Sequence, residues 1–255
     1  MMDERRARFD ALCRAYLSLA GVRDSETIGT YNEKPLHKIL KRTVTSDESC
    51  FEKRIGSYVA DVCEEGSITE IQTGSFYPLA PKLTYFLKET QKDVTVVHPI
   101  TEELTIVRVD PETGEVLRRA KSPKKGRVRD VLPELWYLRD VFPSERLTVA
   151  VPLLRAEEYR YSERQRYRKE GKYDAQFFPL GMLSWVELHT LDDVLALLPD
   201  TLRTEDGFTA EQFGKAMGLP KGRRRAVALL FLCEKGICTR EKKGRSFLYR
   251  ITLKS

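Results

Sequence analysis

Residues Tyr58 to Phe76 read YVADVCEEGSITEIQTGSF, and this stretch predicts two short β-strands joined by a tight turn at Glu65-Gly66. Side chains alternate along a strand, so Asp61 shares a face with its second neighbours, and Glu70 shares a face with Gln72. A hairpin of this kind would bring Asp61 close to Glu70 and Gln72. Two converging carboxylates form a hard-oxygen site suited to Mg²⁺. The alternative is a solvent-facing strand pair with ordinary polar residues.

The spacing within the hairpin resembles the core motif of the PD-(D/E)xK nuclease superfamily, which has the restriction-endonuclease-like fold. Asp61 is followed, after eight residues, by Glu70-Ile71-Gln72. The resemblance implies a metal-dependent DNA endonuclease that hydrolyses phosphodiester bonds. In that reading Asp61, Glu70 and the Ile71 carbonyl hold Mg²⁺ or Mn²⁺, and Gln72 orients the attacking water.

The motif departs from its usual form at two positions. Most members of the superfamily have Lys where this chain has Gln72, and Pro where it has Ala60. A Gln at that position is a variant that resembles some type II restriction enzymes. The missing Lys keeps a second interpretation open, namely a DNA-binding or regulatory protein with a nuclease fold and no catalytic activity.

Two further residues become catalytic candidates through the same resemblance. Asn32 and Pro35 predict the start of a helix, and Glu33 matches the Glu on the first core helix that reaches the metal in many such nucleases. Its alternative role is to complement the helix dipole. Lys82 lies on a helix predicted over Pro78 to Thr90 and could supply the positive charge that Gln72 lacks, although a solvent-exposed Lys is an equally open interpretation.

The composition indicates a soluble globular protein. The chain has 255 residues, of which 41% are hydrophobic and 32% charged, enough for one large domain or two smaller ones. No apolar run approaches a membrane span, and the N-terminus MMDERRARFD has no secretory apolar region. We therefore expect a cytoplasmic protein with no membrane partner. The five cysteines include no CxxC pair, which predicts reduced thiols rather than a zinc site.

Positive charge is concentrated in two segments of the chain. Residues 118–129, RRAKSPKKGRVR, hold seven Lys or Arg and no acid, and residues 220–255 hold eleven Lys or Arg against two acids. This pattern favours a polyanion partner, with DNA the first candidate, over a pair of solvated loops. Ser122-Pro123 and Gly126 argue against regular structure in the first segment, which we interpret as a flexible DNA clamp. Its candidate DNA contacts are Lys121, Lys124, Lys125 and Arg127.

The hydrophobic pattern predicts an α/β core with a mixed sheet flanked by helices. Asp3 to Ala20 has the apolar spacing of a helix. Asp93 to Ile100 and Leu147 to Leu154 are near-continuous apolar runs, typical of buried central strands. Arg127 to Phe142 also has helical spacing. The order of strand, strand, helix, strand and strand fits the restriction-endonuclease-like arrangement.

The C-terminal segment predicts a winged-helix domain. One helix begins after Thr209, a second spans Arg223 to Lys235, and two strands flank the turn at residues 242–245. In a winged helix, the N-terminal residues of the second helix face DNA, although such domains also bind proteins. The candidate DNA contacts are Lys221, Arg223, Arg224 and Arg225 on this helix, and Lys242, Lys243 and Arg245 at the tip of the wing.

The two parts together predict a nuclease domain over residues 1–188 and a winged-helix domain over residues 189–255. This order resembles a family of uncharacterised bacterial proteins with a restriction-like core followed by a winged helix. The resemblance is strongest over the segments EKPLHKILK, YVADV, EIQTGSF, VVHPI and KSPKKGR. A cut through both strands of a duplex usually needs two active sites, which leaves a homodimer open.

Overall fold

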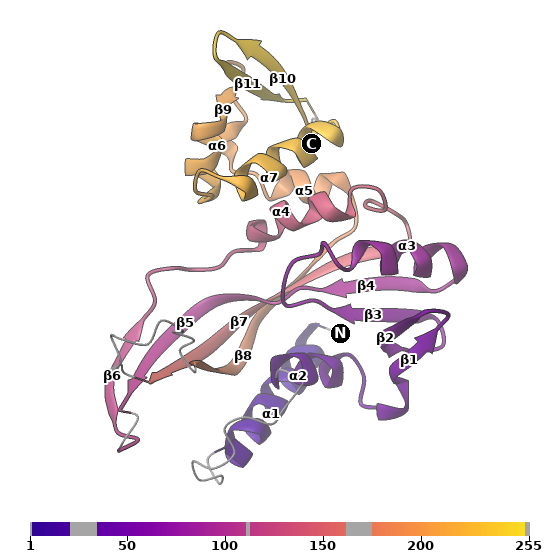
Figure 1. Ribbon diagram of the computed structural model, residues 1–255, viewed down its shortest axis with the longest axis vertical. Helices are drawn as coiled ribbons and strands as arrows, with labels where there is room; N and C mark the ends of the chain where they lie inside the picture. Colours follow the sequence, from indigo (N-terminus) through magenta and orange to yellow (C-terminus); the bar gives the residue numbers. More distant parts are fainter. Residues whose placement is uncertain (1, 21–34, 111–112, 162–174, 253–255) are drawn as a thin grey trace. The chain divides into compact units, whose positions relative to one another are not determined.

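The computed structural model describes residues 2–20, 35–110, 113–161 and 175–252 (Figure 1). Over these residues the chain is an α/β protein with a mixed, multi-stranded sheet and flanking helices, which confirms that part of the sequence prediction. The candidate Glu33 lies outside the described residues. No helix within these ranges is long and apolar enough to cross a membrane.

The helices and strands follow one another along the chain with short connections. The α-helices are α1 (Met2–Ala20), α2 (Pro35–Val44), α3 (Ala80–Glu89), α4 (Leu132–Leu135), α5 (Leu191–Ala196), α6 (Ala210–Met217) and α7 (Arg223–Glu234). The strands are β1 (Phe51–Ile55), β2 (Tyr58–Cys63), β3 (Ser67–Ile71), β4 (Asp93–Val97), β5 (Ile100–Val109), β6 (Val116–Lys121), β7 (Leu147–Tyr161), β8 (Ala175–Leu188), β9 (Phe208–Thr209), β10 (Cys238–Lys243) and β11 (Ser246–Ile251). Short 3-10 turns cover Glu48–Cys50, Val128–Val131, Trp136–Leu138 and Asp200–Leu202.

The chain divides into two compact units. The first comprises residues 1–51, 99–127 and 152–185, and the second comprises residues 52–98, 128–151 and 186–255. The strands hydrogen-bond in the order β1-β2-β3-β4-β7-β5-β6, with β8 beside β7. β7 contributes residues to both units. The boundary predicted between residues 188 and 189 stays a prediction.

The second unit contains the hairpin predicted from the sequence. β2 and β3 are antiparallel, with Val62 opposite Thr69, and β3, β4 and the first part of β7 run parallel. Strands at the centre of a parallel sheet are covered on both faces and therefore have continuous apolar sequences. β3 and β4 meet this expectation, and α3 packs beside β4 with the side chains of Leu83 and Phe86 fully buried.

The first unit is built on the second part of β7. This part runs parallel to β5, which is antiparallel to β6, and β8 also pairs with β7. Helix α1 is amphipathic, with Phe9 and Cys13 fully buried, and lies against α2. The Asp10 carboxylate of α1 accepts a hydrogen bond of 2.8 Å from the backbone N–H of Met182 in β8.

The helix predicted over Arg127 to Phe142 was wrong. The chain instead forms a 3-10 turn, the four-residue α4 and a second 3-10 turn. Pro133 explains the difference, because proline lacks an N–H and fits only the first turn of a helix, where α4 holds it. The apolar residues that suggested the helix are nevertheless buried, including Leu135, Leu138 and Phe142.

The expected irregular structure of residues 118–129 was also wrong in part. Residues 118–121 belong to β6, and a 3-10 turn begins at Val128. Between them, the Gly126 N–H donates a 3.0 Å hydrogen bond to the Thr101 carbonyl. A Cβ at Gly126 would come within 2.4 Å of that carbonyl oxygen, so only glycine fits against β5 at this point.

The C-terminal part of the second unit has the helices and strands predicted from the sequence. Thr209 and Gln212 form a capping box at the start of α6, and Gly218 ends this helix with a left-handed backbone at φ 72°. α7 follows, and the antiparallel hairpin of β10 and β11 pairs with β9. Phe208 and Phe213 stack at the centre of this part, while α7 packs against α4.

Candidate functional site

Asp61 and Glu70 meet where the pairing of β2 and β3 gives way to side-chain contacts. The register that places Val62 opposite Thr69 brings Asp61 opposite Glu70 at the next position. There the Asp61 N–H donates to Glu70 Oε1 at 3.3 Å, and the Ile71 N–H donates to Asp61 Oδ2 at 2.7 Å. The two acids are therefore neighbours, as the hairpin predicted, and each accepts a backbone hydrogen bond from the opposite strand.

Lys82 joins this pair from helix α3. Its Nζ lies 2.5 Å from Glu70 Oε2, and it also lies 5.7 Å from the centre of the Phe86 ring on the next turn of the helix. The side chain of Lys82 is 18% exposed and that of Glu70 only 4%. The ion pair is thus largely removed from water, and Lys82 is not a solvent-exposed lysine.

Burial raises the pKa of Glu70 to about 7, and the charge of Asp61 adds to this effect. The Lys82 ammonium group and the Asp61 N–H act in the opposite direction but do not outweigh burial. The pocket thus holds more negative charge than its single lysine balances. A cation bound at the two carboxylates would compensate that charge.

The carboxylate part of the site is a pair. Within the ranges that the structure describes, no three His, Cys, Asp or Glu residues group together as metal ligands. Mg²⁺ commonly binds one or two carboxylates and fills its remaining positions with water and substrate phosphate. Asp61 and Glu70 fit this mode, with the Ile71 carbonyl, at the end of β3, as the proposed third ligand.

Gln72 lies just beyond β3, and its side chain has another partner. Its amide nitrogen donates to the Ser75 carbonyl at 2.6 Å. The Gln72 carbonyl oxygen lies 2.6 Å from His98 Nδ1. Because a carbonyl oxygen can only accept, Nδ1 must carry the proton. Burial lowers the pKa of His98, which keeps the ring neutral and confirms its interpretation as a structural histidine.

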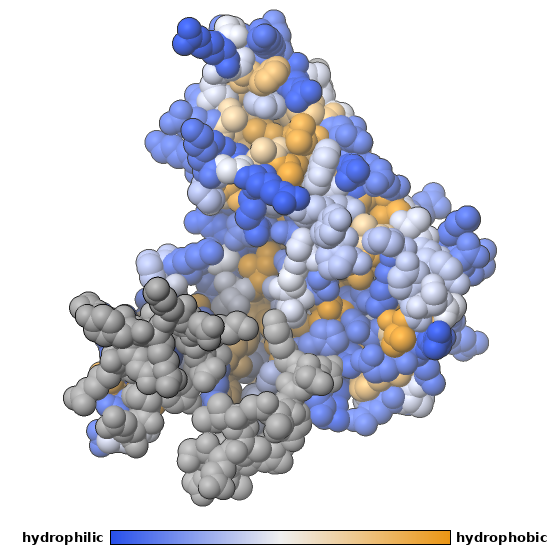
Figure 2. Space-filling model, in the orientation of Figure 1, coloured by the Kyte–Doolittle hydropathy of each residue, from blue (hydrophilic) through white to orange (hydrophobic). Residues whose placement is uncertain are grey.

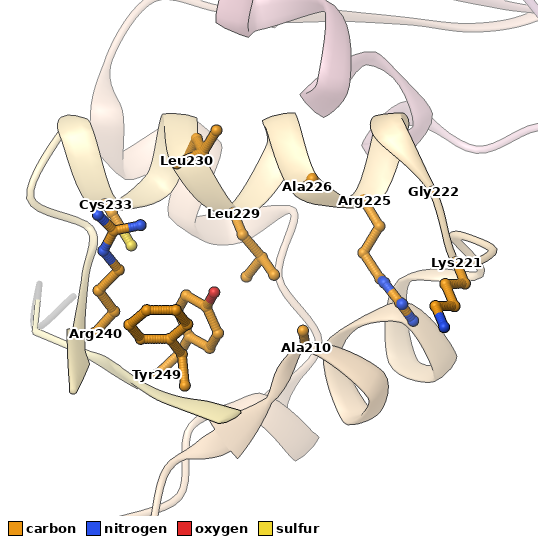
Figure 3. A pocket seen from close by; sticks show the side chains of 11 residues that line it. Ala210, Lys221, Gly222, Arg225, Ala226, Leu229, Leu230, Cys233, Arg240 and Tyr249 are labelled. Atoms are coloured by element: carbon orange, nitrogen blue, oxygen red, sulfur yellow. The ribbon is translucent and has the colours of Figure 1, made fainter. Parts of the chain in front are cut away.

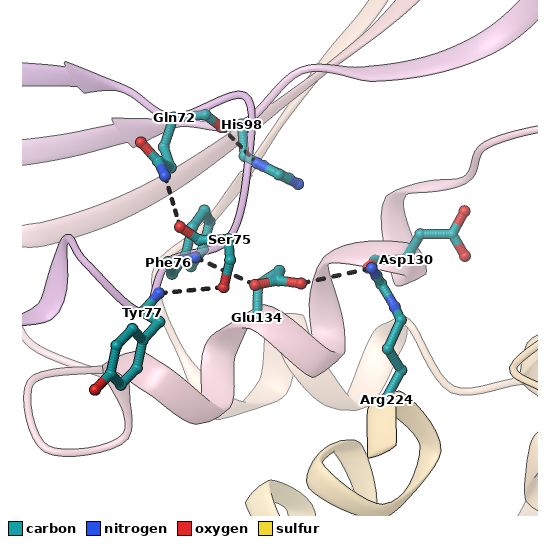
Figure 4. Close-up of polar contacts among 8 residues, drawn as sticks. All are labelled: Gln72, Ser75, Phe76, Tyr77, His98, Asp130, Glu134 and Arg224. Carbon is teal, nitrogen blue, oxygen red and sulfur yellow. Dashed lines mark hydrogen bonds and ion pairs between the residues drawn. The ribbon is translucent and has the colours of Figure 1, made fainter. Parts of the chain in front are cut away.

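The loop between β3 and α3 is held by a carboxylate that the sequence analysis did not single out. Glu134 in α4 is only 7% exposed, and its Oε2 accepts the Phe76 N–H at 3.2 Å (Figure 4). Its Oε1 lies 3.6 Å from Nη1 of Arg224. The available signal was an acid within the otherwise apolar run VLPELW, because a buried charge requires partners.

The basic candidates occupy different surroundings. Lys121, at the end of β6, and Lys124, Lys125 and Arg127 are exposed in the first unit, and Lys242, Lys243 and Arg245 are exposed around the β10–β11 turn. Lys221 and Arg223 are exposed at the start of α7. Arg224 is half-exposed and donates to the Asp130 carbonyl at 3.0 Å besides facing Glu134.

A hollow of about 430 Å³ lies between α7 and the β10–β11 hairpin (Figure 3). Leu229, Leu230 and Phe247 contribute apolar side chains to it, and Arg225 and Lys221 line its other end. Figure 2 shows apolar surface in this region surrounded by hydrophilic side chains. The surface at the start of α7 therefore combines cations with apolar area, which suits a partner with phosphates and flat rings.

Comparison with known proteins places the chain in a family. Residues 34–187 match the family described as Domain of unknown function (DUF8091), and the chain belongs to it. An uncharacterized protein of Treponema pallidum (strain Nichols) is 30% identical over 233 residues, which cover 88% of this chain and 87% of that protein. No solved structure matches the chain. The region matched by the family contains Asp61, Glu70 and Lys82.

Proposed function

We propose that this protein is a metal-dependent DNA endonuclease, with a restriction-endonuclease-like core and a winged helix formed by residues 189–255. One observation carries the proposal, namely the meeting of Asp61, Glu70 and Lys82 in a largely buried cluster. Two acids and a lysine are the residue types that the resemblance assigns to phosphodiester hydrolysis. The raised pKa of Glu70 supports it further, because perturbed carboxylates gather at functional sites.

Each residue of the cluster has a role in this proposal. Asp61 and Glu70, with the Ile71 carbonyl, would hold Mg²⁺ or Mn²⁺. The bound ion would lower the pKa of a water and offset charge on the phosphate in the transition state. Lys82 supplies the positive charge that the motif usually takes from the position of Gln72. Gln72 could orient the water only if its amide left the Ser75 carbonyl, so Lys82 is the stronger catalytic candidate.

The DNA surface follows from the two basic segments. The start of α7 would enter the major groove, as the second helix of a winged helix does. Exposed lysines and arginines at the β10–β11 turn would contact the backbone, and those of residues 121–127 would do so from the first unit. Such contacts neutralise phosphates and release counterions, which supplies most of the affinity of a basic surface for DNA.

The decisive test is cleavage of single-stranded, duplex, branched and mismatched DNA by the full chain, with EDTA, Mg²⁺ or Mn²⁺. We expect metal-dependent cutting of at least one substrate, and its loss in Asp61→Asn and Glu70→Gln. Glu65→Gln is the matched control, because it removes the same charge from an exposed position in the same hairpin. Cleavage that persists unchanged in Asp61→Asn excludes this site.

A second candidate function is DNA binding without catalysis. Two contacts favour it: the Gln72 amide is held by Ser75, and Lys82 already pairs with Glu70. Calorimetric titration with Mn²⁺ separates the two functions. Heat of binding that disappears in Asp61→Asn supports the nuclease, whereas tight duplex binding with no metal binding at this site supports the silent protein.

A further inference from the structure

Glu134 connects two parts of the second unit that the proposed function assigns to different tasks. On one side it accepts the N–H of Phe76, in the loop that leads from Glu70 to Lys82. On the other side it faces Arg224, at the start of α7 (Figure 4). A buried carboxylate is stable only with such partners. Glu134 therefore responds to changes at both ends.

The Phe76 end is rigid. Phe76 is fully buried and packs edge-on against His98, with ring centres 4.9 Å apart. His98 in turn donates to the Gln72 carbonyl at the beginning of the same loop. Phe76 lies midway in the chain between Glu70 and Lys82. A shift of Phe76 therefore moves the segment that positions both of these side chains.

The Arg224 end is open to competition. Arg224 donates to the Asp130 carbonyl at 3.0 Å, but its 3.6 Å distance from Glu134 is longer than a hydrogen bond, and its side chain is 56% exposed. A phosphate group binds a guanidinium with two parallel charge-assisted hydrogen bonds. A phosphate at the start of α7 would therefore compete with Glu134 for the same group.

We infer that Arg224 and Glu134 couple the binding of a phosphate polyanion at α7 to the conformation of residues 72–79. When the phosphate takes Arg224, Glu134 loses its only cationic neighbour among the described contacts, and its hold on the Phe76 N–H weakens. By linkage, a change in this loop must alter polyanion affinity by the same factor. Arg224 is thus a positioning residue rather than only a DNA contact. The identity of the polyanion as DNA rests on the proposed function, whereas the coupling rests on these contacts alone.

Hydrogen exchange of the full chain tests the coupling, with EDTA present so that no cleavage interferes. The probes are a duplex of about two helical turns and inorganic tripolyphosphate, each at saturation. We expect the duplex to speed exchange of the Phe76 amide about fivefold, a typical size for coupling between sites. In Arg224→Ala and Glu134→Gln, saturating duplex should leave this rate unchanged. Arg225→Ala, which removes the adjacent cation, should retain the response.

The outcomes separate the coupling from the proposed function. If tripolyphosphate binds and speeds exchange but DNA does not bind, the coupling stands and the DNA assignment fails. An unchanged Phe76 rate at saturation, or an equal response in wild type and Arg224→Ala, overturns the coupling, as does the failure of both polyanions to bind. Arg224 is half-exposed, so Arg224→Ala keeps the test valid even if Glu134→Gln does not fold.

Discussion

Nζ of Lys82 lies 2.5 Å from Oε2 of Glu70, although these residues come from a helix and a strand separated by a loop. The pair is partly buried, and Asp61 stands directly beside it. One lysine therefore faces two carboxylates, and the site retains an excess negative charge. This imbalance explains why the pKa of Glu70 is raised even though it has a lysine partner.

Replacing Lys82 by Met should destabilise the protein, and the loss should depend on pH. Removing one partner of a buried ion pair leaves an uncompensated charge, which costs about 3 kcal/mol. Below pH 5 the loss should shrink, because Glu70 is then protonated and needs no cation. Urea unfolding at pH 8 and pH 5 measures both values. Lys88→Met, on the exposed side of the same helix, should cost little at either pH, and a pH-independent loss in Lys82→Met would contradict the assignment.

Glu70 should make the folded protein less stable as the pH rises. Its pKa is about 7 in the folded chain against an ordinary value of 4.5, so between these values the folded state keeps a proton that the unfolded state has lost. Its contribution is complete below pH 4.5 and lost as the pH rises through 7, by about 3 kcal/mol. Unfolding in EDTA across this range should show wild type losing stability relative to Glu70→Gln. Glu65→Gln should run parallel to wild type; parallel curves for Glu70→Gln would refute the raised pKa.

The hairpin site was predictable because its signals are local. Alternation fixes which side chains share a face, and a tight turn fixes the register, so Asp61 and Glu70 could be paired from the sequence. The connection through Glu134 was not predictable, because it joins residues 58 positions apart in the chain and depends on how α4 packs. β8 was not predicted either, since Pro179 and Gly181 break its strand pattern.

Asp10 should stabilise the first unit through its contact with β8. Its Oδ1 accepts the Met182 N–H at 2.8 Å, and a Cβ at Gly181 would lie 3.0 Å from the same oxygen, so the helix approaches the strand closely here. We expect Asp10→Ala to cost about 2 kcal/mol, the typical penalty for an unsatisfied buried N–H. Thermal unfolding measures the loss, with Asp3→Ala on the exposed side of α1 as the control. Equal stability of the two variants would show that the contact contributes nothing.

The turn between β10 and β11 should contribute to DNA affinity through charge. Replacing Lys242, Lys243 and Arg245 by Ala should weaken duplex binding and reduce the slope of log affinity against log salt by about 2 to 3, close to one per lost phosphate contact. Fluorescence anisotropy over a range of salt concentrations measures this slope. A control without the exposed Lys53 and Lys88 should keep the wild-type slope. An unchanged slope in the triple variant would remove this turn from the interface.

Cys233 should be the more reactive thiol of a neighbouring pair. Its Sγ lies 3.3 Å from Sγ of Cys238, and the hydrogen bond between them lowers the pKa of Cys233 to about 7 while raising that of Cys238. Burial raises the pKa of Cys13 to about 12. Since the thiolate is the nucleophile, iodoacetamide at pH 7 should modify Cys233 before these other two. Cys238→Ala should slow that reaction about fivefold, because a smaller thiolate fraction outweighs the gain in nucleophilicity. Peptide mass spectrometry measures the rates, Cys50→Ala serves as the control, and an unchanged Cys233 rate in Cys238→Ala would exclude the hydrogen bond as the cause.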